Sequence, residues 1–300
     1  MATHGQPGSG KAVFNECASI QAWLRSVPKG STVAMEATGK YHRLVAELAH
    51  AAGMRVYVLN ARDVYFYAKA LSARGKTDRL DADVIARYAA EHHARLHAWQ
   101  PAAGVEQQLQ ELLQRRSVLT RQLVTLRQTL RDMPTLQAPW QRLQDEYART
   151  FEEIDRQLAD LVDSDLELRE GVARLRTITG FGPQASTLLG ALLRRLPFRN
   201  ADALVAYSGL DPRPCDSGTK RGKRRLSKRG PGALRHLMYM VAFAGAHSKA
   251  LGPLYQAIKA RGFAPTQALV ILARKLLRVA WAVWRSGQAF DPSRLATPQA

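Results

Sequence analysis

Residues 31–59 have the sequence STVAMEATGKYHRLVAELAHAAGMRVYVL, and this stretch decides the fold of the N-terminal part of the chain. The apolar run at 31–35 predicts a buried strand that ends at Glu36, and residues 54–59 predict a second strand. Between them, residues 41–52 have the spacing of a helix, and a glycine follows where a helix cap is expected. Strand, helix and strand in alternation predict an α/β sheet with helices packed on it.

The segments on both sides of this stretch continue the alternation. Residues 17–27 predict a short amphipathic helix, and residues 60–71 begin as a loop and become helical. Residues 78–90 predict a further helix. We therefore assign residues 1–100 to a first, α/β domain.

The next part of the chain changes to a heptad pattern. Two prolines, Pro134 and Pro139, separate two series of apolar residues spaced mostly three or four apart. The first series is Leu109, Leu112, Leu119, Leu123, Leu126 and Leu130, and the second is Tyr147, Phe151, Ile154, Leu158, Leu161 and Leu168. Such series predict an antiparallel helical hairpin or a dimerising coiled coil, and a plain helical bundle would show the same pattern. We assign this segment to residues 101–170.

Residues 171–300 predict a third, all-helical domain. Its sequence TGFGP, at 179–183, ends one apolar helix and opens another, which is the layout of a helix-hairpin-helix. The N–H groups of such a turn, here around Gly180 and Gly182, and the following helix N-terminus can hold a phosphate. A packing corner between two helices would have the same sequence pattern.

The charge of the chain indicates a polyanionic partner. Its 300 residues carry a formal net charge of +19, and a hydrophobic fraction of 46% is sufficient for folded cores. Nucleic acid is the partner that such a charge favours, ahead of an anionic membrane or a generic basic surface. The two cysteines, Cys17 and Cys215, form neither a disulfide framework nor a zinc pattern. Without a signal peptide or a long apolar run, we expect a cytoplasmic protein that makes no use of a membrane.

Three carboxylates are candidates for a metal site. Glu36 follows a buried strand, and Asp78 and Asp81 lie one turn apart at the start of a predicted helix, so both project from nearly the same face. Two neighbouring aspartates repel each other unless a cation lies between them, and oxygen ligands suit a hard divalent metal. Solvated acids near a helix N-terminus would look the same, because the helix dipole favours them there.

The segment 207–235 is strongly basic and contains a candidate nucleophile. Its cations are suited to phosphate contacts: Lys220, Arg221, Lys223, Arg224, Arg225, Lys228, Arg229 and Arg235. Ser217 precedes them, and a serine hydroxyl acts as a nucleophile only if its proton is removed and the developing charge is stabilised. From its local sequence alone, Ser217 is better explained as part of a Ser-Gly turn.

Four motifs in order give the chain a family resemblance. MEATGKYH at 35–42, KTDRLDA at 76–82, TGFGP at 179–183 and the SGLDP…SG…KRRLSKRGPGALR block at 208–235 resemble the insertion-sequence "one-ten" group of transposases, which is related to the Piv DNA invertases. The resemblance covers nearly the whole chain. It implies a RuvC-like DEDD domain of the ribonuclease-H type, a coiled coil, and a helical transposase domain with a catalytic serine.

The resemblance also implies roles for individual residues. The family's glutamate falls on Glu36, its paired aspartates on Asp78 and Asp81, and its serine on Ser217. The acids would hold Mg²⁺, and the serine would become joined to a DNA phosphate. A bridge RNA would pair with donor and target DNA, in the way that other guided systems assign sequence recognition to base pairing. The enzyme would act as a homodimer or homotetramer.

The resemblance has one gap. The family's first aspartate lies on an opening strand of the type G-x-D-x-S-K, whereas this chain opens with MATHGQPGSGK. We therefore expect an N-terminally truncated RuvC-like domain with three of the four acids, explained by a start codon placed too late or by a decayed copy of the element. Loss of a central strand exposes unpaired backbone groups, and loss of the acid weakens metal binding.

Taken with its composition and charge, this resemblance implies a transposase or site-specific DNA recombinase that uses a serine nucleophile and Mg²⁺ and is guided by RNA. One alternative is a hydrolytic Holliday-junction-type nuclease, which would use the acids and water without a covalent serine. Another is a catalytically decayed nucleic-acid-binding remnant, whose binding would be sensitive to salt but would not lead to cleavage.

Overall fold

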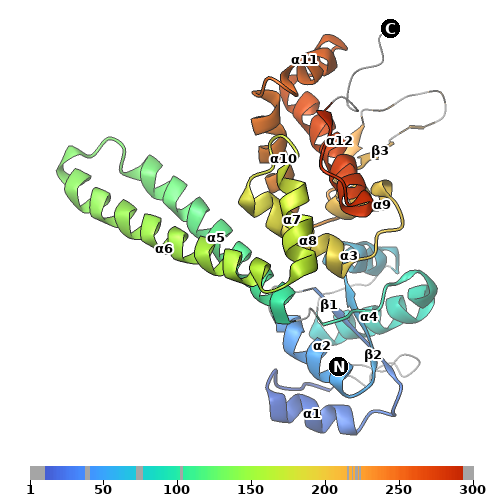
Figure 1. Ribbon diagram of the computed structural model, residues 1–300. Helices are drawn as coiled ribbons and strands as arrows, with labels where there is room; N and C mark the ends of the chain where they lie inside the picture. The colour runs from blue at the N-terminus through green and yellow to red at the C-terminus, as the bar shows by residue number, and fades with distance from the viewer. Residues whose placement is uncertain are drawn as a thin grey trace. The chain divides into compact units, whose positions relative to one another are not determined.

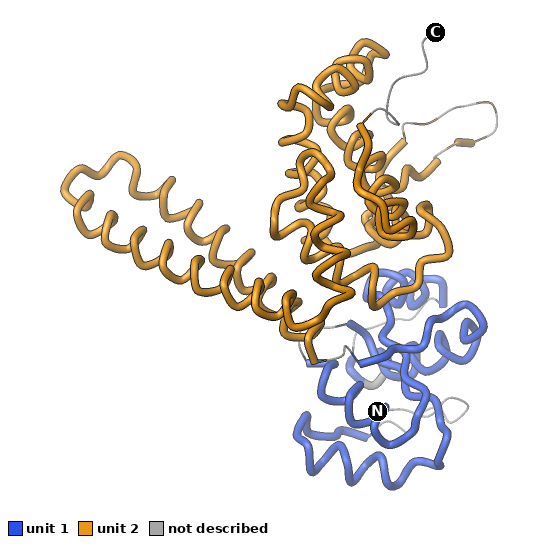
Figure 2. Tube along the Cα trace, in the orientation of Figure 1, with its two compact units in different colours: residues 1–101 blue, residues 102–300 orange. Residues whose placement is uncertain are grey.

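The computed structural model describes residues 11–37, 41–71, 77–101, 104–214, 216–217, 219, 222 and 224–292. The chain divides into two compact units, unit 1 at residues 1–101 and unit 2 at residues 102–300 (Figure 2). The described residues are predominantly helical, with two small sheets. None of the described helices is both long enough and apolar enough to cross a membrane.

Unit 1 contains the expected strand, helix and strand. Strand β1 (Thr32–Glu36), helix α2 (Tyr41–Ala51) and strand β2 (Arg55–Leu59) follow each other, and the two strands pair in parallel with Glu36 opposite Leu59. Three further helices flank them (Figure 1): α1 (Cys17–Arg25), α3 (Ala61–Ala70) and α4 (Asp78–His92), the last followed by the short 3-10 helix η1 (His93–Arg95).

Alternation along the strands divides the core of unit 1 between the two faces of the sheet. Val33 and Val56 pack with Ile20 of α1 and with α2, whereas Tyr57 and Leu59 pack with α3 and α4. Successive side chains of a strand point to opposite faces, so each short strand contributes to both clusters. The two-stranded sheet is therefore covered by helices on both faces.

The side chain of Tyr67 connects α3 to α4. Its hydroxyl donates a 2.6 Å hydrogen bond to Glu91, and its ring makes edge contacts with Tyr88 and His92. Burial, and then the neighbouring carboxylate of Glu91, raise the pKa of Tyr67 to about 12. This contact fixes the inner face of α3 against α4.

Unit 2 begins with a long helical hairpin. Helix α5 (Gly104–Thr129) and helix α6 (Gln137–Asp163) run side by side and are joined through the 3-10 helix η2 (Pro134–Leu136) (Figure 1). Of the arrangements that the heptad pattern left open, the structure shows the helical hairpin. The Arg116 guanidinium donates to both carboxylate oxygens of Asp155 across the pair, at 2.6 and 2.7 Å.

Two details of the expected heptad pattern are wrong. Pro139 does not break the pattern, because it lies in the first turn of α6, where a missing N–H costs no helical hydrogen bond. Leu168 does not belong to the second hairpin helix. Helix α6 ends at Asp163, and Leu168 lies in the next helix, α7 (Leu166–Arg176), whose N-cap Asp165 accepts from the Leu168 N–H at 3.0 Å.

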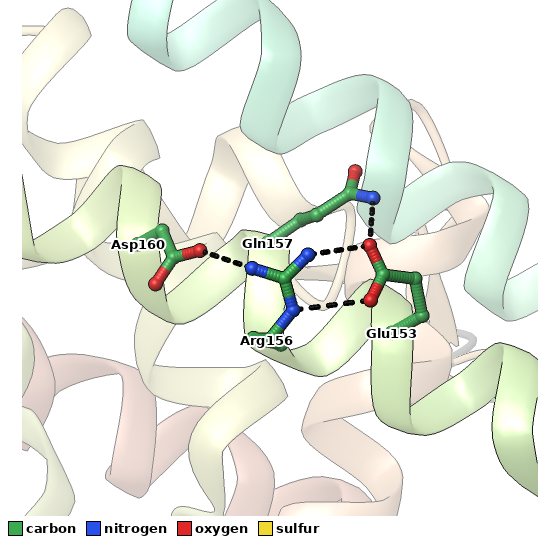
Figure 3. A network of polar contacts seen from close by, with 4 residues as sticks. All are labelled: Glu153, Arg156, Gln157 and Asp160. Atoms are coloured by element: carbon green, nitrogen blue, oxygen red, sulfur yellow. Dashed lines mark hydrogen bonds and ion pairs between the residues drawn. The ribbon is translucent and has the colours of Figure 1, made fainter.

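The outer surface of α6 carries a network of charged side chains (Figure 3). Arg156 contacts Glu153 at 2.7 and 3.0 Å and Asp160 at 3.0 Å, and Gln157 donates to Glu153 at 2.6 Å. These side chains are one helical turn apart and exposed to solvent, so the pairs contribute little to stability.

The remaining helices of unit 2 pack around one long central helix. This helix, α12 (Pro265–Ser286), has a fully buried stripe that includes Leu272, Leu276 and Ala280. Around it lie α7 and the helices α8 (Pro183–Arg195), α9 (Ala201–Ser208), α10 (Gly232–Ala246) and α11 (Gly252–Ala260). Residues at the spacing of a helical face are buried together because they share one side of the helix.

An ionic cluster joins the base of the hairpin to this bundle. The Arg194 guanidinium of α8 lies 3.3 Å from Glu106 of α5 and 2.7 Å from Asp165, with Glu167 at 3.8 Å. The Glu106 side chain is 9% exposed, so its charge depends on this cation for compensation.

The predicted all-helical character of residues 171–300 is wrong in one place. Strand β3 (Pro212–Arg213) pairs antiparallel with strand β4 (Arg225–Leu226). Each strand has two residues, which is too short for alternation to be visible in the sequence. This small hairpin encloses the predicted nucleophile, Ser217.

Candidate functional site

The three predicted acids lie at the ends of two packed elements of unit 1. Glu36 is the last residue of β1, and Asp78 and Asp81 are in the first turn of α4, which packs against β1. Thr77 caps this helix by accepting from the Leu80 N–H at 3.3 Å. The cap and the positive end of the helix dipole favour carboxylates at these positions.

These acids do not form a metal centre as they are placed. Among the residues that the structure describes, no group of three or more His, Cys, Asp or Glu side chains is arranged to hold a metal ion. Asp78 is exposed, and Glu36 and Asp81 are partly exposed. The chemistry of the donors fits a hard cation, whereas their placement does not bring the three carboxylates together.

Ser217 lies in the loop between β3 and β4 and is exposed to solvent. Its neighbour Asp216 accepts from the Gly222 N–H at 3.1 Å and from the Arg224 guanidinium at 2.8 Å. The Arg224 contact is the main reason why the pKa of the Asp216 carboxyl is lowered. These two bonds connect Asp216, the residue before Ser217, to Gly222 and Arg224 further along the loop.

A second set of bonds closes the base of the same hairpin. Ser227, directly after β4, donates a short hydrogen bond from its hydroxyl to the carboxylate of Asp211, directly before β3. The Ser227 N–H also donates to the Asp211 carbonyl at 3.0 Å, and the Lys228 N–H donates to the Gly209 carbonyl at 3.0 Å. Ser227 is buried, so this residue of the basic segment serves to fix the β3–β4 hairpin.

The end of the basic segment lies against the C-terminus of α9. A Cβ at Gly230 would lie 1.8 Å from the Tyr207 carbonyl oxygen, so only glycine fits there. Arg235, at the start of α10, donates to the carbonyls of Ser208 (3.3 Å) and Gly230. The basic segment therefore combines exposed cations with at least one arginine that binds the backbone.

The predicted nucleic-acid contacts fall into three groups. Lys220, Arg221 and Lys223 lie outside the described residues. Arg224, Arg225, Lys228 and Arg229 are exposed, and Arg224 also binds Asp216. Arg235 is partly buried and binds carbonyl oxygens.

The two turn glycines differ in their surroundings. Gly180 has φ +94°, and a Cβ on it would lie 2.5 Å from the Val241 carbonyl oxygen of α10. Gly182 is the N-cap of α8, is exposed, and has no described atom within 4 Å of such a Cβ. The close packing of Gly180 explains this glycine without a ligand, whereas Gly182 is open to solvent.

One charged group near the β3–β4 hairpin was not recognised as a candidate from the sequence. Arg274 of α12 is partly buried, and its Nε is buried without a hydrogen-bond partner among the described residues. Burial, and then the charge of Arg278, lower the pKa of Arg274, while Asp211 and Asp202 oppose this. Arg278 itself binds Asp202 at 2.8 Å. The apolar periodicity of α12 gave no signal for this pair of arginines.

Comparison with known proteins decides the family. A DEDD transposase model matches residues 11–137, and a model described as transposase IS116/IS110/IS902 family matches residues 172–256. The chain belongs to the IS116/IS110/IS902 family of transposases. The resemblance in the four sequence motifs is therefore confirmed. Membership makes DNA the substrate, and DEDD transposase domains typically use a divalent metal ion.

Individual relatives of the family support this assignment. The chain is 30% identical over 265 residues to the pilin gene-inverting protein of Moraxella bovis, a match that covers 86% of this chain and 81% of that protein. The pilin gene-inverting protein of Moraxella lacunata matches with the same identity and coverage, 30%, 86% and 81%. The insertion element IS116 uncharacterized 44.8 kDa protein of Streptomyces clavuligerus is 31% identical over 148 residues, 46% of this chain and 37% of that protein.

Proposed function

We propose that the chain cuts and rejoins DNA through Ser217, as a transposase or DNA invertase of an insertion sequence that acts in the cytoplasm under the guidance of a bridge RNA. The observation that carries the proposal is the hairpin of Ser217: an exposed hydroxyl on a loop fixed at its base by Asp211 and Ser227. A nucleophile must be held in position, and this loop is held from both sides.

The chemical step that we propose is a phosphoryl transfer. The Ser217 Oγ forms a bond to a DNA phosphorus, the bond from that phosphorus to one deoxyribose oxygen breaks, and this oxygen leaves as a hydroxyl. The serine proton is transferred, directly or through solvent, to the leaving oxygen, and the nearby cations stabilise the charge on the phosphate. Reversal by another strand's hydroxyl restores the serine and rejoins the DNA.

The exposed cations supply the phosphate contacts of the proposal. Arg225, Lys228 and Arg229 lie on β4 or within three residues of it, and all three are exposed. Contacts of this kind hold nucleic acid without reading its sequence, which agrees with base pairing to a guide RNA as the source of specificity.

The acids enter the proposal separately. We assign Glu36, Asp78 and Asp81 to a divalent ion, Mg²⁺, within a RuvC-like domain, on the chemistry of carboxylate ligands and the match to a DEDD transposase model. The described geometry does not group the three acids, so the phosphoryl transfer at Ser217 is proposed without a contribution from this ion. We also propose that the enzyme acts as a homodimer or homotetramer. Residues 101–170 and 171–300 are proposed to form separate domains.

The test is a search for a protein–DNA adduct. The full-length chain is incubated with the bridge RNA, Mg²⁺ and a plasmid carrying the element ends, and a protease-sensitive adduct is located by mass spectrometry. We expect the DNA on Ser217, and Ser217→Ala should lower recombination by on the order of a thousandfold or more. Thr219→Ala is the matched control, because it removes an exposed hydroxyl from the same loop.

Three outcomes contradict the proposal. An adduct that persists in Ser217→Ala would place the nucleophile elsewhere. Cleavage that survives Ser217→Ala and is lost in Asp78→Asn would indicate a hydrolytic nuclease. Salt-sensitive binding of DNA without any cleavage by the wild-type chain would indicate a binding remnant.

A further inference from the structure

Helix α3 of unit 1 exposes two aromatic rings side by side. Tyr65 and Phe66 are 53% and 52% exposed, and their ring centroids lie 5.5 Å apart with an edge-to-face angle of 69°. Large apolar side chains on an otherwise polar surface often mark a contact site when they are grouped. Two adjacent rings on one helix are such a group.

A cationic side chain lies over each of these rings. The Lys69 Nζ lies 4.8 Å from the ring centre of Tyr65, and the Arg62 guanidinium carbon lies 5.5 Å from that of Phe66. Both distances are within the range of a cation–π contact. The spacing of the four residues (i, i+3, i+4 and i+7) places them on one side of α3.

The core of unit 1 does not require this side of the helix. Val64 is buried and Ala68 packs with it, and these residues hold α3 against the sheet and α4. The third aromatic residue of the helix, Tyr67, has its hydroxyl bonded to Glu91. Tyr65 and Phe66 are therefore the aromatic residues of α3 that face solvent.

We propose that this face of α3, formed by Arg62, Tyr65, Phe66 and Lys69, binds unpaired bases of single-stranded DNA. Every base has a flat π-face that stacks on an aromatic ring, and the flanking cations can contact the phosphates. In a duplex these base faces are stacked on each other, so the rings select unpaired nucleotides. Cutting and rejoining of strands is a process in which such nucleotides occur.

Charge and area favour DNA over a protein partner. Lys is depleted in protein–protein interfaces, whereas here Lys69 lies over one of the two rings. Two rings also supply far less than the roughly 800 Å² per partner that a stable dimer buries. The net charge of +19 agrees with a polyanionic occupant.

This inference goes beyond the proposed function, because it concerns a site on unit 1 and needs neither Ser217 nor a metal ion. It is tested without cleavage. Fluorescence anisotropy measures binding of the full-length chain to labelled oligothymidine, to a DNA duplex and to oligouridine, in buffer without magnesium. Thermal unfolding shows that each variant is folded.

The informative variant is Tyr65→Leu/Phe66→Leu, which keeps apolar side chains but removes the rings. We expect its affinity for oligothymidine to fall about tenfold or more, since base–aromatic stacking corresponds to roughly 5- to 150-fold per base. Its affinity for the duplex should stay within about twofold, because phosphate contacts dominate duplex binding. Phe14→Leu is the matched control, because Phe14 is 79% exposed and lies outside α3. This substitution is expected to leave both affinities unchanged. The exchange Tyr65→Phe/Phe66→Tyr should bind like the wild type.

Four results would overturn the inference. The first is an unchanged affinity for oligothymidine in the leucine variant, and the second is an equal loss for the duplex. The third is a loss confined to oligouridine, which would make RNA the occupant. The fourth is a change of oligomeric state in analytical ultracentrifugation, which would make a second copy of the chain the occupant.

Discussion

Replacing Gly180 by serine should destabilise unit 2 strongly, whereas the same change two residues later should not. Gly180 has φ +94°, a conformation that costs a residue with a side chain about 1–2 kcal/mol. Its Cβ would also lie 2.5 Å from the Val241 carbonyl oxygen and 3.1 Å from the Gly245 nitrogen, both backbone atoms of α10. Moving α10 away adds about 1–3 kcal/mol, as for other overpacked cores. The expected loss is the sum, about 2–5 kcal/mol.

Thermal unfolding followed by circular dichroism measures this loss. For a unit of this size each kcal/mol corresponds to roughly 2–4 °C, so Gly180→Ser should lower the Tm by about 4–20 °C. Gly182→Ser is the matched control, since serine is a good N-cap and no described atom lies within 4 Å of its Cβ. Its Tm should change by less than about 2 °C. Equal losses in the two variants, or none in Gly180→Ser, would refute the packing argument.

Two further predictions concern charged groups of unit 2. Arg194→Met should cost about 2–4 kcal/mol in chemical denaturation, because it leaves the buried Glu106 uncompensated, and adding Glu106→Gln should recover more than half of the loss; simple addition of the two losses would show that the residues are not coupled. Arg224→Gln should raise the carboxyl titration midpoint of Asp216 in NMR, because Arg224 is the main cause of its lowered pKa. In the unsubstituted chain, the contribution of the Arg224–Asp216 pair to stability is present above the pKa that Asp216 has when unfolded, and it is lost as the pH falls through the lower pKa of folded Asp216. An unchanged titration midpoint in Arg224→Gln would mean that the pair does not form in solution.

The local elements of unit 1 could be predicted because their signals are local. The strand before Glu36, the helix that follows and the strand at 55–59 begin and end within one or two residues of the expected positions. Each is defined by a short run of apolar periodicity and a glycine or polar boundary. Nothing distant is needed to recognise them.

The helix boundaries predicted from apolar periodicity were wrong where that periodicity continued across the end of a helix. Leu168 remains in phase with the apolar residues of α6, although Asp165 caps a new helix between them. Pro139 looks like a helix breaker, but a proline in the first turn interrupts nothing. The two-residue strands β3 and β4 are held by tertiary contacts and leave no pattern of their own.

The candidate site was only partly accessible from the sequence, because charge alone does not separate roles. In the sequence, residues 220–235 form one basic run, but in the structure Arg224 binds Asp216 and Arg235 binds backbone carbonyls, while Arg225 is exposed. Ser227, a residue of the basic segment, is buried and closes the hairpin. Such roles depend on which group each side chain meets, and the partner can lie many residues away.

Asp211 shows why the hairpin and α12 should be considered together. Its carboxylate accepts from Ser227 at the hairpin base, and its charge also opposes the lowering of the pKa of Arg274. A partly buried guanidinium next to Arg278 is costly unless a carboxylate compensates for it. Asp211 therefore serves two neighbours at once, since it fixes the loop of Ser217 and offsets a cation of the central helix. Asp211 and Arg274 are 63 positions apart, so no sequence pattern could indicate this relation between the base of the β3–β4 hairpin and α12.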